Sequence, residues 1–469
     1  MKIEHILYII FLLHIIVYLR GKGDKMKKAM LISLVLTMAS LCFGTVRRVP
    51  SQYSTIQAAL DAANGGDSVV VSKGTYNENV NIEDNGVKLV SESGPDSTEI
   101  HGNGGVTISS SASGSDTTTL LYGFKVTGGT GGYGGEGGGL RLWQQAMKIK
   151  NCIFTDNEAN EGGGLYLERS RSVVESCLIY GNAAPPKTSP GGAGGGIYSF
   201  SDAGDFPPII RNNTIINNSA DGFTDLIFGG AAIALHKTGG TIINNLIEDN
   251  TAAYGNGGIG VMLMSGTYNV TIQNNIIRNN DSVAIDLRYL HANNVHINNN
   301  QITGHQYGVR FTYWTYGTVA DATNNWWGAE SGPYHATLNP SGMGDGVKDT
   351  VVSSTHTIDF DPWTHSIAVE EVKPREPPYT LSTCWPNPFV HQTSVKLESK
   401  FWTVVSAIVF DITGREVRCI MNGCPKSAGS YNISWDGKDR YGKQVPPGMY
   451  FYRVKVNNTC KTMKVIMIR

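Results

Sequence analysis

Ile242-Ile-Asn-Asn-Leu-Ile247, Ile272-Gln-Asn-Asn-Ile-Ile277 and Ile297-Asn-Asn-Asn-Gln-Ile302 are three copies of one six-residue pattern, and this pattern decides the fold. Consecutive copies along the chain start 25 to 36 residues apart, and three of the seven intervals are 25 residues. A period of this length is typical of a parallel β-solenoid, in which stacked coils share an apolar core that no coil could form alone. The weaker copies start at Leu121, Ile149, Val174, Ile210 and Ala322.

The fourth position of the pattern forms a column when the coils are stacked. An asparagine there can pair amide to amide with the copy above and below, which satisfies polar groups beside the core. Cys152 and Cys177 occupy consecutive rungs, and we expect packed thiols there, with a disulfide as the alternative. The column consists of Phe124, Cys152, Cys177, Asn213, Asn245, Asn275, Asn300 and Asn325.

Each copy is followed by a second short strand with alternating apolar residues, as in 139–143, 164–168, 196–200 and 284–288. Alternation predicts that one side faces the core and the other faces water. Stacking then aligns the outward side chains on one face, about 4.8 Å apart from coil to coil. We take eight of them as candidate ligand-binding residues, namely Trp143, Tyr166, Glu168, Tyr198, His236, Asp286, Arg288 and Arg310.

This face has the chemistry of a sugar-binding surface. Aromatic rings stack on sugar rings, while arginine and carboxylate side chains hydrogen-bond hydroxyl groups or uronic acids. Asp286, Arg288 and Arg310 are near neighbours in the predicted register, so they could bind an acidic sugar or serve in acid–base chemistry. The alternative is an ordinary solvated sheet face with aspartate–arginine pairs.

The start of the solenoid also has a sequence signature. Residues 54–63 have helical apolar spacing and begin with a capping residue, which predicts a helix over the open first coil. With the strand 68–71 and the Gly74-Thr-Tyr-Asn-Glu78 motif, this entry resembles that of pectin-lyase-like proteins, and the run 324–328 resembles their closing coil. The resemblance covers roughly residues 46–365 and implies an all-β, right-handed parallel β-helix. The same fold carries lyases, hydrolases, esterases and adhesins, so it does not fix the chemistry.

The C-terminal part differs in composition. Residues 366–378 are charged and proline-rich, which indicates a linker, and short β-patterned runs follow over 379–469. The motifs 385–389, 410–417 and 434–439 resemble the flagellar hook-capping Ig-like domain and the related C-terminal sorting domains of type IX secretion. The resemblance implies a small Ig-like β-sandwich with the secretion machinery as its partner. Its four cysteines allow three disulfide pairings, which stay open: Cys384, Cys419, Cys424 and Cys460.

The N-terminal residues 1–44 predict export. Met26-Lys-Lys28 precedes an apolar stretch and small residues near Gly44, which is the pattern of a signal peptide whose translation starts at Met26. A membrane anchor at residues 6–19 is the alternative, but that run is shorter than the roughly 20 residues needed to span a bilayer. We therefore expect an extracellular or outer-surface protein with no stable membrane span after signal removal.

Composition and motifs narrow the function. The net charge of -1 lacks the basic footprint of a nucleic-acid-binding protein. The paired aspartates and Gly-His-Gly run of polygalacturonases are absent, since His305 lies in Gly-His-Gln, and no zinc or phosphate-loop motif occurs. We expect no cofactor or metal and assign no catalytic residue. A polysaccharide-binding β-helix is favoured; a polysaccharide lyase or hydrolase and a structural envelope protein are the alternatives.

Overall fold

The computed structural model describes residues 44–83, 86–110, 118–185, 192–221, 230–253, 256–263, 268–290, 294–312, 319–349, 351–352, 355–364, 379–399, 403–426, 429–456 and 459–468. The chain forms two compact units, Met1–Trp363 and Thr364–Arg469. The predicted signal region before residue 44 and the predicted linker 366–378 lie outside the described residues. None of the helices in the described part of the chain is both long and apolar enough to cross a membrane.

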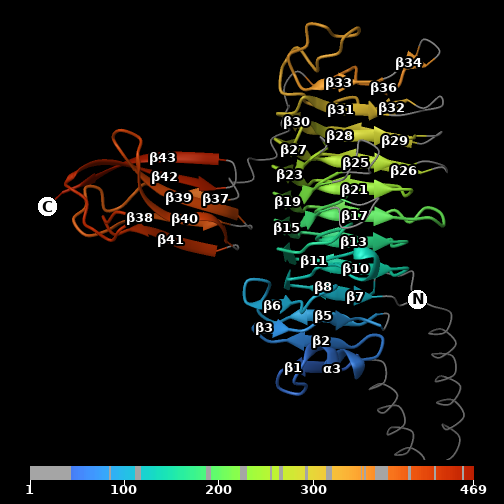
Figure 1. Cartoon of the computed structure of the whole chain (residues 1–469), viewed down its shortest axis with the longest axis horizontal. Coiled ribbons are helices and arrows are strands. Elements are labelled where there is room, and N and C mark those ends of the chain that lie inside the picture. Colours follow the sequence, from blue (N-terminus) through green and yellow to red (C-terminus); the bar gives the residue numbers. More distant parts are fainter. Residues whose placement is uncertain are drawn as a thin grey trace, which may run out of the picture. The chain divides into compact units, whose positions relative to one another are not determined.

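The first unit is a right-handed parallel β-helix whose coils are stacked as Figure 1 shows, from β1 to β36. Within the described residues, three long parallel sheets run along it, with 12, 9 and 10 strands. The twelve-stranded sheet contains β1 (Val46–Val49), β2 (Ser68–Val71), β5 (Lys88–Ser91), β8 (Leu120–Tyr122), β11 (Lys148–Lys150), β14 (Val173–Glu175), β18 (Ile209–Arg211), β22 (Gly240–Ile243), β26 (Asn269–Gln273), β29 (Asn294–Asn298), β32 (Ala320–Asp321) and β36 (Ile358–Asp359).

The other two sheets complete each coil. The nine-stranded sheet contains β3 (Gly74–Asn77), β6 (Thr98–His101), β9 (Lys125–Thr127), β12 (Ile153–Thr155), β15 (Leu178–Tyr180), β19 (Thr214–Ile216), β23 (Leu246–Glu248), β27 (Ile276–Arg278) and β30 (Gln301–Thr303). The ten-stranded sheet contains β4 (Val80–Asn81), β7 (Ile108–Ser110), β10 (Leu140–Trp143), β13 (Leu165–Glu168), β17 (Ile197–Phe200), β21 (Ile233–His236), β25 (Ile259–Met262), β28 (Val283–Arg288), β31 (Tyr307–Thr312) and β33 (Gly346–Lys348).

Short elements decorate the coils. A 3-10 turn, η1, spans Tyr133–Gly135. A three-stranded parallel sheet joins β16 (Ala183–Ala184), β20 (Ser219–Ala220) and β24 (Thr251–Ala252), and an antiparallel pair joins β34 (Val351–Val352) and β35 (Thr355–His356).

The six-residue pattern is two strands with a bend between them, where the sequence suggested one strand. In the copy at Ile242, β22 ends at Ile243 and β23 begins at Leu246, so the copy contributes to two sheets. The bend is made at the third position, where Asn244 has φ 58° and Asn274 has φ 56°. Asparagine tolerates this left-handed conformation better than most residues, which explains its recurrence in the pattern.

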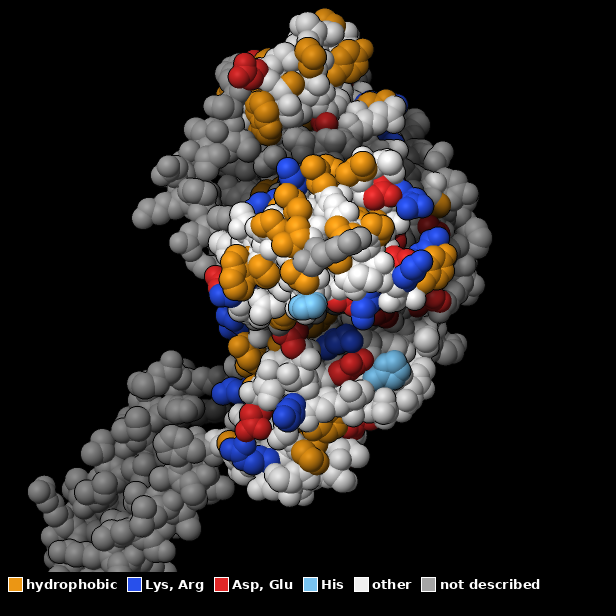
Figure 2. All heavy atoms as spheres, turned by 90° about the vertical axis from the view of Figure 1, so that its left-hand side faces the viewer, with side chains coloured by type: hydrophobic (Ala, Val, Ile, Leu, Met, Phe, Trp, Pro, Cys, Tyr) orange, Lys and Arg blue, Asp and Glu red, His pale blue; other side chains and the backbone are white. Residues whose placement is uncertain are grey.

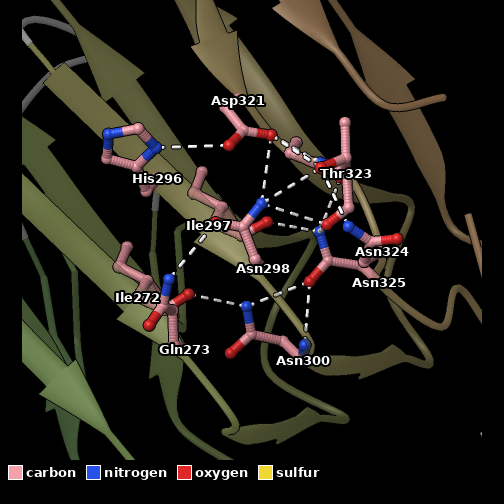
Figure 3. A network of polar contacts seen from close by, with 11 residues as sticks. Ile272, Gln273, His296, Ile297, Asn298, Asn300, Asp321, Thr323, Asn324 and Asn325 are labelled. Carbon is pink, nitrogen blue, oxygen red and sulfur yellow. Dashed lines mark hydrogen bonds and ion pairs between the residues drawn. The ribbon is translucent and has the colours of Figure 1, made fainter. Parts of the chain in front are cut away.

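The predicted asparagine column is confirmed as a continuous amide ladder. Asn245 donates from Nδ2 to Oδ1 of Asn275 at 3.0 Å, and Asn300 donates to Asn325 in the same way at 3.0 Å, as Figure 3 shows for the last rungs. Cys152 and Cys177 continue the column as buried free thiols, and the backbone N–H of Cys177 donates to Oδ1 of Asn213. The amides therefore satisfy backbone groups at the bend as well as one another.

A second ladder lies one bend further along the coil and was not predicted. Each asparagine donates to the next along the stack, as Asn182 does to Asn218 at 3.0 Å, and His305 closes the series by accepting from the backbone N–H of Asn280. Asp345 holds His305 through Nδ1 at 2.7 Å. His305 is therefore part of the fold's polar scaffold. The ladder runs through Asn157, Asn182, Asn218, Asn250, Asn280 and His305.

The cap helix is present as α3 (Ile56–Asp61), beside β1 and β2 at the first coil in Figure 1. Thr55 is its N-cap and accepts from the backbone N–H of Ala58 at 3.1 Å, so the helix begins one residue later than the Ser54 cap suggested. Ile56 and Leu60 are buried against the first coils. The helix thus covers apolar surface that the first coil would otherwise expose.

The second unit is a small antiparallel structure of two sheets. One contains β37 (Tyr379–Leu381), β38 (Thr393–Ser399) and β41 (Gly429–Trp435); the other contains β40 (Glu416–Lys426), β39 (Thr403–Asp411), β42 (Gly448–Val456) and β43 (Thr459–Met467). The sequence missed β37 and β40. Trp435 and Tyr452 are buried between the sheets, while Trp385 and Tyr441 are 78% and 79% exposed, and Figure 2 shows hydrophobic side chains among charged ones on this unit. Among the described cysteines, Cys384, Cys419 and Cys424 are free thiols.

Candidate functional site

The eight candidate residues all lie on the ten-stranded sheet, in two columns set by its register. The register places each candidate beside the same position of the next coil, as predicted. The first outer column contains Arg141, Tyr166, Tyr198, Ala234, Gly260, Asp286, Arg310 and Lys348. The second outer column contains Trp143, Glu168, Phe200, His236, Met262, Arg288 and Thr312.

The expectation that these positions face water is wrong for five of the eight. Trp143 is 40% exposed, and Glu168 and Arg310 are partly exposed, but the other five are at most 8% exposed. Alternation decides which side of a strand a side chain takes, whereas exposure depends on what packs against that side. The five buried residues are Tyr166, Tyr198, His236, Asp286 and Arg288.

At the N-terminal end of the face, aromatic rings pack on one another. The rings of Tyr166 and Tyr198 are stacked, with centroids 5.5 Å apart and planes 13° apart, and they pack with Ala193 and Ala234. The hydroxyl of Tyr198 lies 2.7 Å from Nδ1 of His236 and also shares a side-chain hydrogen bond with Glu161. Tyr198 therefore links a carboxyl group to an imidazole. We call Glu136, Glu161, Tyr166, Tyr198 and His236 the glutamate–tyrosine cluster.

Sequence reasoning missed Glu136 and Glu161, which lie at the coil corner before β10 and β13. The two residues pair directly across adjacent coils in a parallel bridge. Each is followed by three glycines, and the corner turns at Gly162, which has φ 67°. A Cβ at Gly162 would lie 2.5 Å from the carbonyl oxygen of Leu165. The signal was in the sequence: Glu-Gly-Gly-Gly-Leu occurs at 136 and again at 161, one coil period of 25 residues later.

The electrostatics of the glutamate–tyrosine cluster are unusual for a protein surface. Burial raises the pKa of Glu161 to about 7, with further contributions from the negative charges of Glu136 and Glu168. Burial also raises the pKa of Glu168, and the charge of Glu136 adds to this effect. Burial lowers the pKa of His236 to about 3, assisted by Lys237. Near neutral pH, Glu161 is thus poised between its two protonation states and His236 is neutral.

Arg141 anchors the other glutamate. Its terminal nitrogen donates to Oε2 of Glu136 at 2.9 Å, and the two side chains are 33% and 28% exposed. Glu161 is itself only partly buried. The carboxyl groups therefore lie where solvent and a ligand can reach them, although the tyrosine rings beside them are covered.

At the C-terminal end of the face, one carboxylate is completely surrounded by donors. Asp286 has no exposed side-chain surface and accepts from Nε of Arg288 at 2.7 Å and from the Thr312 hydroxyl at 2.7 Å. Arg310 adds two hydrogen bonds, each of 3.1 Å, from Nε and a terminal nitrogen. We call Asp286, Arg288, Arg310 and Thr312 the aspartate–arginine cluster. The predicted proximity of its three charged residues is confirmed, but an aspartate bound in this way is poorly suited to acid–base chemistry.

The described residues contain no group of three or more His, Cys, Asp or Glu side chains that could hold a metal ion. The chemistry that the face offers in those residues is therefore that of its own carboxyl, imidazole, phenol and guanidinium groups.

Comparison with solved structures finds other β-helices at low identity. The A-module of mannuronan C-5 epimerase AlgE4 from Azotobacter vinelandii is 17% identical, with a TM-score of 0.34; the match covers 58% of this chain and 90% of that one. Tailspike protein 2 of Escherichia coli O157:H7 bacteriophage CAB120 is 11% identical, with a TM-score of 0.32 and coverages of 90% and 68%. A pectin methylesterase is 12% identical, with a TM-score of 0.28 and coverages of 69% and 91%. No curated protein matches the chain.

Two family models match the sequence. The FlgD Ig-like domain matches residues 389–459, in agreement with the resemblance of the C-terminal motifs. The right handed beta helix region matches residues 63–325, which is more than half of the 469 residues and includes both clusters. The chain belongs to the right-handed β-helix family and carries a C-terminal FlgD Ig-like domain.

Proposed function

We propose that the β-helix binds an acidic polysaccharide along the outer face of its ten-stranded sheet. The observation that carries this proposal is the register of the two outer columns, which repeats aromatic, acidic and basic side chains from β10 to β31 at the spacing of the coils. Six coil steps separate Trp143 from Thr312, which is roughly 29 Å at about 4.8 Å a step. A face of this length suits a polymer better than a single sugar.

The accessible groups at the two ends favour an acidic polymer. The guanidinium of Arg310 is 17% exposed, and Lys348, its neighbour in the first outer column, is exposed. The hydrogen bonds to Asp286 use Nε and one terminal nitrogen of Arg310, and a guanidinium carries five N–H donors. Arginine pairs readily with carboxylates. At the other end, the indole of Trp143 is 40% exposed and offers a surface for a sugar ring.

The test is direct binding of the purified full-length protein to polygalacturonate and alginate, with neutral dextran as the comparison. We expect binding to an acidic polymer and a loss of about tenfold or more in the Arg310→Ala, Lys348→Ala double variant, because charged hydrogen bonds contribute roughly 1.5–3 kcal/mol. Arg211→Ala, on the twelve-stranded sheet, is the matched control because its side chain is also partly exposed and paired with a glutamate. Absence of binding to both acidic polymers, or equal binding to dextran, would contradict the proposal and favour a structural role.

We also propose that the protein is exported and that the C-terminal unit serves secretion or surface attachment. The signal-peptide pattern from Met26 and the sorting-domain motifs support this proposal. Deleting residues 379–469 tests it in the native host: the truncated protein should be retained inside the cell envelope. Normal appearance of the truncated protein at the surface or in the medium would leave the unit as a spacer.

A further inference from the structure

We propose that Glu161 and Glu136 form the catalytic pair of a glycoside hydrolase site on this face, with Glu161 as the general acid and Glu136 as the nucleophile. The inference rests on the proposed function, since it requires a polysaccharide on the ten-stranded sheet. It assigns chemistry to a coil corner that contributes none of the eight residues predicted from sequence.

The stacking of the coils fixes the spacing of the pair. Glu136 and Glu161 are bridge partners on adjacent coils, so their backbones lie about 4.8 Å apart and their side chains leave the same corner. Glycosidases that retain anomeric configuration hold their two carboxyl groups about 5–5.5 Å apart. Both glutamates are partly exposed, and Trp143, at the end of the strand that follows Glu136, offers its ring to a sugar.

The two carboxyl groups have different environments, as an acid and a nucleophile require. Glu161 lies partly buried beside the tyrosines, with Glu136 and Glu168 as its negative neighbours, and burial with these charges favours its protonated form near pH 7. Glu136 is held at Oε2 by the guanidinium of Arg141, which favours the ionised form of a carboxyl group. One proton is therefore available to the pair, and it resides on Glu161.

The reaction balances with water as the co-reactant. Glu161 donates its proton to the glycosidic oxygen as the bond from that oxygen to the anomeric carbon breaks, and a carboxylate oxygen of Glu136 bonds to the same carbon. The released sugar leaves as an alcohol. Water then attacks the anomeric carbon, the ester bond to Glu136 breaks, and the proton of that water returns to Glu161.

Tyr198 and His236 act as positioning residues. The Tyr198 hydroxyl bonds both the Glu161 carboxyl and Nδ1 of His236, so it fixes the direction of the acid. His236 remains neutral in its buried position and adds no positive charge that would lower the pKa of Glu161. The stacked ring of Tyr166 holds Tyr198 in place.

The experiment measures new reducing ends and, in parallel, unsaturated uronates after incubation of the full-length protein with polygalacturonate and alginate. We expect reducing ends without unsaturation. Glu161→Gln and Glu136→Gln should each lower the rate by a factor of about 10² or more while polymer binding is retained. The rate should fall as pH rises through about 7, because Glu161 then loses its proton. Glu158→Gln, an exposed glutamate three residues away, should leave the rate unchanged.

The outcomes separate the two proposals. A wild-type protein that binds an acidic polymer but releases no reducing ends overturns the catalytic inference and leaves the binding function intact. Full activity in either glutamine variant, or unsaturated products in place of hydrolysis, also overturns it. Loss of binding by the Arg310→Ala, Lys348→Ala double variant together with loss of cleavage supports both. Because glutamine is nearly isosteric with glutamate, a retained melting temperature confirms that the variants are folded.

Discussion

The two ends of the ten-stranded sheet both carry covered carboxyl groups, but they surround them differently. Asp286 accepts four hydrogen bonds from two arginines and a threonine, and its charge is compensated within the sheet. Glu161 lies beside two other glutamates, and burial raises its pKa to about 7. A carboxylate saturated by donors stabilises the fold, whereas one set among like charges is held ready for proton transfer. Within one face, the neighbours decide the role of the residue.

This contrast also corrects the view of the face as a row of equivalent outward side chains. Ala234 and Gly260, which carry small side chains or none, separate the glutamate–tyrosine cluster from the aspartate–arginine cluster in the first outer column. One end therefore offers cationic anchoring, and the other offers aromatic and acidic groups. A single extended ligand could engage both.

The largest expected effect breaks the compensated end. Asp286→Ala leaves Arg288 buried without its carboxylate, and removing one partner of a buried ion pair costs about 3–5 kcal/mol. Urea denaturation of the purified protein should show this loss for the β-helix transition. Arg310→Ala should cost less, because Arg310 is more exposed than Arg288 and Asp286 keeps the Arg288 and Thr312 bonds. A loss below about 1 kcal/mol for Asp286→Ala would show that the cluster contributes little to stability.

The next effect is the pH dependence of stability at the uncompensated end. The folded-state pKa of Glu161, about 7, is above its ordinary value of 4.5, so between these pH values the folded protein binds more protons than the unfolded chain. This contribution to stability is present at low pH and is lost as pH rises towards 7. Glu161→Gln should remove it and gain up to about 3 kcal/mol above pH 7, measured by denaturation across pH. An unchanged slope in Glu161→Gln, compared with Glu158→Gln, would contradict the assignment.

A smaller effect sharpens the role of the tyrosine link. Tyr198→Phe removes the hydroxyl between Glu161 and His236 and should cost about 1–3 kcal/mol, since the buried His236 loses a partner. Because that hydroxyl lowers the pKa of Glu161, the variant should also move the pH-dependent loss of stability to higher pH. Tyr122→Phe, on the twelve-stranded sheet, is the matched control. If both tyrosine variants behave alike, the link has no special role.

The smallest effect on stability is expected at Trp143. Its ring is 40% exposed, and substitutions at such positions usually change stability by about 0.5 kcal/mol or less. Trp143→Ala should therefore keep the melting temperature and weaken binding to polygalacturonate or alginate in the same assay. A large drop in melting temperature with unchanged binding would assign the ring to packing.

The sequence by itself determined the solenoid, because a fold that repeats every coil leaves a repeated pattern. The asparagine column, the outer-face register and the C-terminal motifs were all visible as spacing or as resemblance, and they are confirmed from Asn245 and Asn275 to the FlgD Ig-like domain. The repeat could also have revealed Glu136 and Glu161, one period apart, but corner residues were taken as turns.

Only the tertiary structure decided which outward residues are covered and what surrounds each charge. Tyr198 and Asp286 have the same alternation as Trp143, yet they are buried, because exposure depends on packing between coils and not on strand period. The pKa of Glu161 likewise depends on burial and on Glu136, which is 25 residues distant in sequence and adjacent in space. A periodic sequence fixes positions along a β-helix, while the chemistry of a position depends on the neighbours that stacking brings to it.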